Sequence, residues 1–527
     1  MSDDSKKNRP VVLVVLDGWG VAPPSHGNAI TMAKTPFFTK MISNYFVTTL
    51  QASGLSVGLP WGESGNSEVG HLNLGAGKII YQTLPRIDKS IEDEDFFNNE
   101  KFLEAIDHCR KNKSKLHLMG LLSSGGVHSS IEHLFALLEL CRQQKFDQVF
   151  IHVFLDGRDT PHNSAEKFIK DLEKKCKELK VGKIATMSGR FYAMDRDNHW
   201  ERIEKPYLAI VQGKGKLSGN PLEAIKNSYA ENVFDEEFLP VVITEKNEPI
   251  ARVENNDSLI FFNYRADRAR EITKAFVDPE IKGFQRGERI ENLFFVAMAE
   301  YEEGMPVEVA FPPEKIENPL AKVLSDQGLF QYHTAETEKY AHVTYFFNGG
   351  NEKPHLNEEW ELIPSPRVSS YDQKPEMSAK KVTEKVVLAV NSDKYDFIVV
   401  NFANPDMVGH TGKIEPTIEA LEFLDQMLEK IVETTLKKNG TVILTADHGN
   451  ADDLVSLRTG GMDKEHSSNP VPFVLINKDW QQQEKVEEEE VDLSLIEPSG
   501  VLADVAPTIL KLLDVPQPKE MNGNPLI

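Results

Sequence analysis

The sequence predicts a multidomain α/β protein, because short apolar runs that end in polar residues alternate with stretches of helical length. The chain has 527 residues, of which 40% are hydrophobic, which suits about two to four domains with sizeable cores. The run from Val11 to Leu16 is continuous and largely β-branched, as is typical of a strand buried on both faces in a parallel sheet. Residues 130–143 and 164–179 favour helices between runs of this kind.

The charge and the amino-acid composition argue against some classes of function. The formal charge of -23 and the pI near 5.2 argue against nucleic-acid and membrane-surface binding, in which a basic face supplies affinity. An anionic substrate would need a local basic pocket. The three cysteines, Cys109, Cys141 and Cys176, are odd in number and widely spaced, which favours a reducing compartment. With no apolar segment in the first ten residues or long enough to span a bilayer, we expect a cytoplasmic protein.

Asp17 directly follows the first apolar run. Open α/β sheets bind ligands in the crevice at the carboxyl ends of their strands, so Asp17 is a candidate ligand. The alternative is an aspartate that shapes the turn before Gly18. Residues 28–47 then favour a helical stretch, interrupted at Pro36.

Ser67 lies between glycines in a polar segment, Gly65-Asn66-Ser67-Glu68-Val69-Gly70-His71. A serine hydroxyl becomes a nucleophile when an adjacent base or a metal activates it. No Gly-x-Ser-x-Gly elbow surrounds Ser67, whereas aspartates and histidines after apolar runs are plentiful, so metal activation is favoured. The alternative is a serine that caps a helix.

A second α/β unit follows a helical region around residues 88–110. Its expected strands, at 116–122, 149–155, 183–187 and 259–263, end near cationic residues. These residues, with one aspartate among them, are His128, Arg158, Asp159, Arg190, Arg196, Arg265 and Arg268. Arginine suits bidentate recognition of carboxylate and phosphate, which predicts a small substrate that carries both. Asp159 could orient or deprotonate a substrate hydroxyl, or it could pair with Arg158.

Metal-ligating residues gather after the chain crosses back to the first unit near residues 311–319. Apolar runs at 397–402 and 441–445 each precede an aspartate and a histidine, and a third histidine stands before the run at 471–476. Together with Asp17, these are Asp406, His410, Asp447, His448 and His466. Mixed oxygen and nitrogen ligands suit manganese or zinc, and a bridging serine completes a set large enough for two ions. Lys339 could contact a phosphoryl group, or it could be a solvated charge.

The order of these motifs resembles the cofactor-independent phosphoglycerate mutases of the alkaline phosphatase superfamily. The matching segments include Leu16-Asp17-Gly18-Trp19-Gly20, Gly65 to His71, Gly126-Val127-His128-Ser129, Asp156 to Pro161, Phe262 to Arg268, Ala335 to Tyr340, Asn401 to His410 and Thr445 to Asn450. The resemblance implies an alkaline-phosphatase-like α/β/α domain, residues 1–81 and 316–527, interrupted by an inserted α/β transferase domain, residues 82–315.

The resemblance also implies two manganese ions. One ion would be held by Asp406, His410 and His466, and the other by Asp17, Ser67, Asp447 and His448. The phosphoglycerate would be bound by His128, Arg158, Asp159, Arg190, Arg196, Arg265, Arg268 and Lys339. The family pattern is broken at Ser130, His162 and Glu465, and Glu465 could be a hydrogen-bonding partner of His466.

The activity that the resemblance implies is the interconversion of 3-phosphoglycerate and 2-phosphoglycerate in glycolysis and gluconeogenesis. Ser67 would carry the phosphoryl group, Asp159 and Lys339 would assist, and no 2,3-bisphosphoglycerate would be needed. A mutase must exclude water from the phosphoserine, which is a reason to expect the domains to close on the substrate. The family leans to monomers. The alternatives are a metal-dependent phosphatase or other phosphomutase of the superfamily, and a catalytically silent metal-binding homologue.

Overall fold

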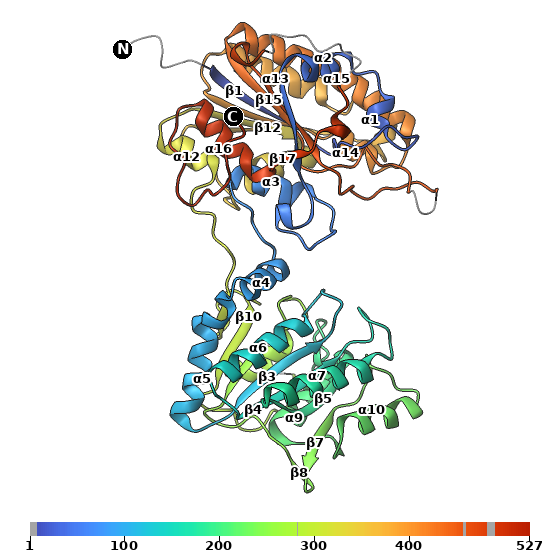
Figure 1. Ribbon diagram of the computed structural model, residues 1–527, viewed down its shortest axis with the longest axis vertical. Coiled ribbons are helices and arrows are strands. Elements are labelled where there is room, and N and C mark those ends of the chain that lie inside the picture. Colours follow the sequence, from blue (N-terminus) through green and yellow to red (C-terminus); the bar gives the residue numbers. More distant parts are fainter. Residues whose placement is uncertain (1–7, 282, 457–459, 482–490) are drawn as a thin grey trace. The chain divides into compact units, whose positions relative to one another are not determined.

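A computed structural model describes residues 8–281, 283–456, 460–481 and 491–527, so most of the polar amino-terminal stretch lies outside the described residues. The chain forms two compact units: unit 1 is Met1–Gln82 with Glu314–Ile527, and unit 2 is Thr83–Pro313. Each unit contains one large sheet with helices on both faces (Figure 1), so the predicted α/β class is confirmed. No helix among the described residues is long and apolar enough to cross a membrane.

The sheet of unit 1 has eight strands in the order β13-β12-β14-β1-β15-β16-β2-β17. The strands are β1 (Asn8–Leu16), β2 (Phe46–Gln51), β12 (Gln331–Glu336), β13 (Glu358–Ile363), β14 (Phe397–Phe402), β15 (Gly440–Thr445), β16 (Val471–Ile476) and β17 (Pro498–Val501). Strand β1 pairs in parallel with β14 and β15. Its side chains from Val11 to Leu16 are 0% exposed, and burial of each large aliphatic side chain contributes about 1.5–3 kcal/mol.

Two helical layers cover this sheet (Figure 1). One layer contains α1 (Ala29–Met32), α2 (Pro36–Asn44), α13 (Ala379–Asn391), α14 (Asn404–Gly409) and α15 (Ile414–Lys437); the other contains α3 (Ser67–Ala76), α12 (Leu320–Asp326) and α16 (Val505–Leu512). Short turns of 3₁₀ helix are η2 (Gly54–Val57), η4 (Thr337–Lys339), η6 (Tyr371–Gln373), η7 (Lys478–Trp480), η8 (Leu493–Leu495) and η9 (Leu502–Asp504), and η5 (His342–Phe346) is a π-helical turn.

The helical stretch predicted for residues 28–47, with its interruption at Pro36, is confirmed as far as Asn44, because α1 ends at Met32 and α2 begins at Pro36. Proline fits the first helical position, where its missing N–H is not needed. The helix ends at Asn44, and Phe46 begins β2, which pairs with β16 on one side and β17 on the other. Sheet pairing therefore decides the conformation of the last residues in this stretch.

Unit 2 contains a second sheet, in the order β11-β10-β9-β3-β4-β5-β7-β6, with β8 paired to β7. Its strands are β3 (Leu116–Leu122), β4 (Val149–Leu155), β5 (Lys183–Gly189), β6 (Lys216–Ser218), β7 (Val241–Glu245), β8 (Glu248–Pro249), β9 (Ser258–Phe261), β10 (Phe294–Ala299) and β11 (Glu308–Phe311). Its helices are α4 (Thr83–Glu92), η3 (Asp95–Asn98), α5 (Glu100–Asn112), α6 (Ile131–Gln143), α7 (Ala165–Leu179), α8 (Arg190–Ala193), α9 (Trp200–Gln212), α10 (Pro221–Ala230) and α11 (Arg270–Val277). One apolar core packs against α5, α6 and α7, and another against α9 and α11.

Candidate active site

Ser67 is the first residue of α3 and is 7% exposed. The N-cap of this helix is Asn66, whose side chain accepts a hydrogen bond from the N–H of Val69 at 3.0 Å. The alternative that Ser67 serves as the cap is therefore wrong. Its hydroxyl is free to contact groups outside the helix.

Three side chains surround the Ser67 hydroxyl. Its Oγ lies 2.9 Å from His448 Nε2, 3.2 Å from Asp17 Oδ1 and 2.6 Å from Lys339 Nζ. These side chains follow β15, β1 and β12 along the chain. Because these strands run parallel in one sheet, with β14 between β1 and β12, their carboxyl ends meet at one edge, where ligands of open α/β sheets bind.

The remaining predicted ligands lie at the same edge. Asp406 belongs to α14, which follows β14, and His410 is the C-cap of that helix. Asp406 Oδ1 is 3.2 Å from His410 Nε2 and 3.3 Å from His466 Nε2, and the two histidine Nε2 atoms are 3.1 Å apart. Asp447 Oδ2 lies 3.7 Å from His448 Nε2.

The histidine tautomers show that this geometry suits a cation. His410 Nδ1 lies 2.7 Å from the carbonyl oxygen of Lys464, and His466 Nδ1 lies 2.8 Å from that of Gly65. A carbonyl oxygen only accepts, so each Nδ1 carries the hydrogen and a neutral ring has its lone pair on Nε2. Two neutral rings would face lone pair against lone pair at 3.1 Å, so the pair requires a proton or a metal cation between them.

Buried negative charge in this cluster also indicates that the site suits a cation. Asp447 Oδ1 is buried without a hydrogen-bond partner among the described residues, and Oδ2 faces the ring nitrogens of His71 at 3.1 Å and His448 at 3.7 Å. Lys339 Nζ lies 2.6 Å from both Asp17 Oδ1 and Asp406 Oδ2. Burial lowers the pKa of Lys339, but these carboxylates outweigh it and raise the pKa above its ordinary value. Burial likewise lowers the pKa of His448, and Asp447 foremost raises it to about 9.

Two overlapping groups of side chains are close enough to hold metal ions. Asp406, His448 and His466 form one group, and Asp17, Asp447 and His448 form the other. Within each group the ligand atoms lie within 4.8 Å of one another. Oxygen and imidazole ligands of this kind suit manganese or zinc. Among the described residues, the donor set therefore fits divalent cations.

The cationic residues of unit 2 also gather at one sheet edge. Strands β9, β3, β4 and β5 are parallel neighbours, and each carries predicted residues just beyond its carboxyl end. These residues are Arg265 and Arg268 after β9, His128 after β3, Arg158 and Asp159 after β4, and Arg190 and Arg196 after β5.

Asp159 is paired with Arg190 rather than with Arg158. Arg190 Nη1 donates to Asp159 Oδ2 at 2.5 Å and to Asp156 Oδ1 at 2.7 Å. Arg158 extends a 56% exposed side chain that lies 3.6 Å from Glu236. The alternative of an Asp159–Arg158 salt bridge is therefore wrong.

A second carboxylate, Asp267, lies among the remaining cations. It is 3.2 Å from Arg196, 3.1 Å from Arg265 and 3.7 Å from His128 Nδ1. Arg268 instead donates to a backbone carbonyl, that of Met194. Burial lowers the pKa of His128 to about 4, with a further contribution from Arg190, so His128 is neutral near pH 7.

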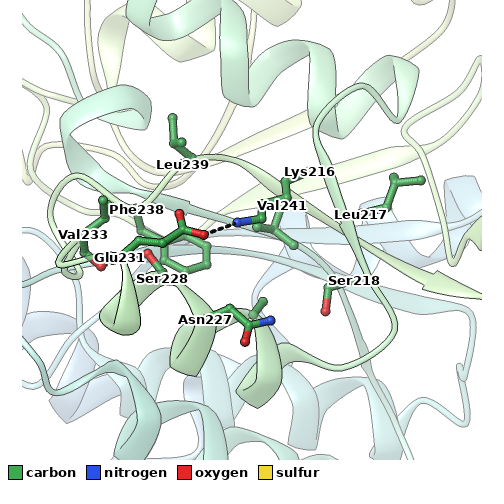
Figure 2. Close-up of a pocket in the computed structure, with 11 residues that line it drawn as sticks. Lys216, Leu217, Ser218, Asn227, Ser228, Glu231, Val233, Phe238, Leu239 and Val241 are labelled. Carbon is green, nitrogen blue, oxygen red and sulfur yellow. Dashed lines mark hydrogen bonds and ion pairs between the residues drawn. The ribbon is translucent and has the colours of Figure 1, made fainter.

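A small pocket elsewhere in unit 2 does not share these features. Figure 2 shows it between β6, β7 and α10. Its charged lining residues, Lys216 and Glu231, lie 3.3 Å apart as an ion pair. The predicted site residues do not line it, so this pocket is no part of the candidate active site.

Known proteins match both units. The family model described as BPG-independent PGAM N-terminus matches residues 87–303, and the model described as type I phosphodiesterase / nucleotide pyrophosphatase matches residues 311–499. The 2,3-bisphosphoglycerate-independent phosphoglycerate mutase of Clostridium novyi is 51% identical over 98% of this chain and 99% of its own length. That of Chloroflexus aurantiacus is 49% identical, with 98% of each chain covered.

The chain belongs to the 2,3-bisphosphoglycerate-independent phosphoglycerate mutases. Members of this family are isomerases. A crystal structure of Leishmania mexicana phosphoglycerate mutase at low cobalt concentration has 31% sequence identity and a TM-score of 0.52, and covers 98% of this chain and 97% of that one. The fold is thus an α/β unit that matches the type I phosphodiesterase model and is interrupted by the α/β unit that matches the BPG-independent PGAM N-terminus. The two groups of candidate ligands agree with a metal-dependent mutase.

The three departures from the mutase pattern have local explanations. Ser130 is the N-cap of α6, where its side chain accepts from the N–H of Glu132. The ring of His162 packs edge-on against Phe234. Glu465 is exposed. The backbone carbonyl of Gly65 lies beside His466 Nδ1, where Glu465 was predicted as a possible hydrogen-bonding partner.

Sequence reasoning missed Asp156 and Asp267. Asp156 is 2% exposed and accepts from Ser123, from two backbone N–H groups and from Arg190. The signal for both was their place inside the motifs around Arg158 and Arg265, where an acid among arginines suggests a carboxylate that orients them.

Proposed function

We propose that the protein interconverts 3-phosphoglycerate and 2-phosphoglycerate through a phosphoserine on Ser67, with two manganese ions and without 2,3-bisphosphoglycerate. The observation that carries this proposal is the environment of Ser67 Oγ. It lies within 3.2 Å of Asp17, Lys339 and His448, which is a setting for an activated nucleophile rather than for a helix cap.

Seven side chains would hold the two ions. Asp406, His410 and His466 would hold one, and Asp17, Ser67, Asp447 and His448 the other. When bound, the ions supply positive charge that lowers the pKa of the serine hydroxyl and neutralises the transferring phosphoryl group. The converging Nε2 atoms of His410 and His466 and the buried, unpartnered Oδ1 of Asp447 support this allocation.

The chain's own groups would carry the phosphoryl transfer. Ser67 Oγ attacks phosphorus, the bond from phosphorus to the glycerate oxygen breaks, and the phosphoserine forms while free glycerate remains. Lys339 Nζ, 2.6 Å from Ser67 Oγ, is within reach of a phosphoryl oxygen and would stabilise the charge that develops there. Reversal at the other hydroxyl of glycerate completes the isomerisation.

Unit 2 would retain the glycerate between the two transfers. The arginines at its sheet edge, Arg158, Arg190, Arg196, Arg265 and Arg268, suit a carboxylate and a phosphate. His128, whose ring is neutral near pH 7, would add a hydrogen bond. Asp159 would exchange a proton with the glycerate hydroxyls. The partner is thus a small molecule, and we propose that the protein acts as a monomer.

Phosphorus NMR tests this function. The metal-stripped protein is reloaded with manganese and given 3-phosphoglycerate without bisphosphoglycerate. We expect a 2-phosphoglycerate signal that a Ser67→Ala variant does not produce. Release of inorganic phosphate alone would favour a phosphatase of the superfamily, and an unchanged spectrum would favour a silent metal-binding homologue; either result contradicts the proposal.

A further inference from the structure

Two buried asparagines outside the predicted ligand set each donate to a carboxylate within it. Asn401 Nδ2 donates to Asp17 Oδ2 at 2.6 Å, and Asn450 Nδ2 donates to Asp406 Oδ1 at 2.8 Å. Both asparagines are 0% exposed. Each amide therefore fixes one oxygen of a carboxylate, while the opposite oxygen of that carboxylate faces Lys339.

Asn401 also connects Asp17 to a second carboxylate through His71. The Nδ2 of Asn401 lies 3.0 Å from His71 Nε2, and His71 Nδ1 lies 2.9 Å from the carbonyl oxygen of Ser67 and 3.1 Å from Asp447 Oδ2. Because a carbonyl oxygen only accepts, His71 Nδ1 donates and Nε2 accepts from the amide. The donor and the acceptor of each hydrogen bond are thus determined along the chain from Asp17 through Asn401 and His71 to the carbonyl oxygen of Ser67.

The hydrogen bonds of the asparagines themselves do not explain how their side-chain amides are oriented. The Oδ1 atoms of Asn401 and Asn450 are buried and have no hydrogen-bond partner among the described residues. A buried acceptor without a partner is unfavourable. Rotating either amide by 180° would turn its oxygen toward a carboxylate oxygen, so the carboxylates dictate the observed orientation.

We propose that these residues are positioning residues, one set for each metal ion. Asn401 with His71 orients Asp17 and Asp447, and Asn450 orients Asp406. Hydrogen bonds to metal ligands fix the ligand geometry and tune metal affinity. This inference rests on the proposed two-ion function. It adds that each asparagine controls the affinity of the protein for one ion and leaves the affinity for the other ion unchanged.

Manganese titration of the metal-stripped protein tests this inference. Free Mn²⁺ is followed by electron paramagnetic resonance for the full-length chain and for Asn401→Ala and Asn450→Ala. We expect the unsubstituted protein to bind two ions, and each variant to bind one of them about 10–100-fold more weakly. In a His410→Ala background, which removes a ligand of the Asp406 ion, Asn401→Ala weakens the remaining ion and Asn450→Ala does not.

Asn404→Ala is the matched control. Asn404 is also 0% exposed, donates through Nδ2 to a backbone carbonyl at 2.8 Å and has an unpartnered Oδ1, but it does not bond to a predicted ligand. It should keep both manganese affinities. His71→Asn, which can present an amide N–H near the position of Nδ1, should bind manganese more tightly than His71→Ala. Melting curves in chelator establish that each variant is folded.

Two outcomes contradict the account in different ways. If the unsubstituted protein binds two ions and Asn401→Ala and Asn450→Ala match Asn404→Ala, the positioning role is wrong while the proposed function stands. If the unsubstituted protein binds fewer than two ions, the two-ion function fails and the inference fails with it.

Discussion

Lys339 places its ammonium against two carboxylates and the Ser67 hydroxyl, each at 2.6 Å. If this charge stabilises the transferring phosphoryl group, Lys339→Met should lower kcat by about 10²–10³-fold, the usual cost of removing one such donor. Steady-state assays with saturating manganese and 3-phosphoglycerate measure this effect. A kcat within threefold of the unsubstituted enzyme would contradict the role, and an unchanged KM would separate it from substrate binding.

Glu336 is a buried carboxyl at the end of β12 and is 1% exposed. Burial raises its pKa to about 7, although Ser365 and the N–H of Ser378 donate to it. A carboxyl whose folded-state pKa is raised favours folding below its unfolded-state pKa, and that contribution is lost as the pH rises through about 7.

Glu336→Gln should therefore flatten the pH dependence of stability. Relative to the unsubstituted protein, the variant should gain free energy of unfolding between about pH 5 and pH 8, by up to about 3 kcal/mol. Thermal melts at matched pH values measure the difference. Parallel melting curves across this range would show that Glu336 does not titrate as described.

Individual site residues were predictable where they directly follow an apolar run. Asp17 and Asp447 stand just past buried strands, and parallel pairing brings such ends together. Asp267 carried a signal only through its place beside Arg265, and Asn401 was not predictable as a site residue, because its partner Asp17 lies far away in the sequence. Asn401 shows only as a polar residue in an apolar strand, and only the fold places it against Asp17.

At the level of elements, α3 depends on glycines that let it approach other segments. A Cβ on Gly70 would lie 2.6 Å from the carbonyl oxygen of Asp447, and one on Gly75 would lie 1.9 Å from that of Phe347. These are backbone contacts that cannot rotate away. The close approach holds Ser67 beside the ends of β1 and β15.

Gly70→Ala should shift α3 or Asp447 and impair the site. We expect at least about a 10²-fold loss of kcat/KM, since a displacement of about 1 Å at a reacting group has an effect of that size. Gly219→Ala is the control, because a Cβ there has no atom within 4 Å and needs no positive φ. Equal activity of the two variants would contradict the packing role of Gly70.

Long apolar strands were predicted with accurate bounds, as the segments 116–122, 149–155, 397–402 and 471–476 correspond to β3, β4, β14 and β16. Their side chains are nearly all buried, so composition alone marks them. Strands such as β12 and β13 are polar in sequence and carry no such mark. They form because parallel pairing next to β14 satisfies their backbone groups.

On the scale of the whole molecule, the apolar cores follow the division into two units. The cores of unit 2 draw their buried residues from positions 87–311, and the main core of unit 1 draws on positions 11–74 and 320–521. The proline-rich and polar stretch at residues 311–319 indicated where the chain returns to the first unit, whereas the segment bounds 1–81, 82–315 and 316–527 came from the family resemblance. The role of each segment stays a prediction.

Unit 2 should consequently fold by itself. A fragment of residues 83–313 is expected to give a cooperative thermal transition by circular dichroism and well-dispersed amide resonances, because its cores are complete within those residues. A non-cooperative melt or collapsed spectra would show that unit 2 needs unit 1 to fold.

The central claim is that the phosphoryl group passes through Ser67. Rapid-quench mass spectrometry of the Ser67 peptide during the first turnover of 3-phosphoglycerate tests it most directly. The account predicts a phosphate on Ser67 that appears at least as fast as 2-phosphoglycerate and decays as substrate is exhausted. Formation of 2-phosphoglycerate with no phosphate on Ser67 at any time, or by Ser67→Ala at an undiminished rate, would contradict it.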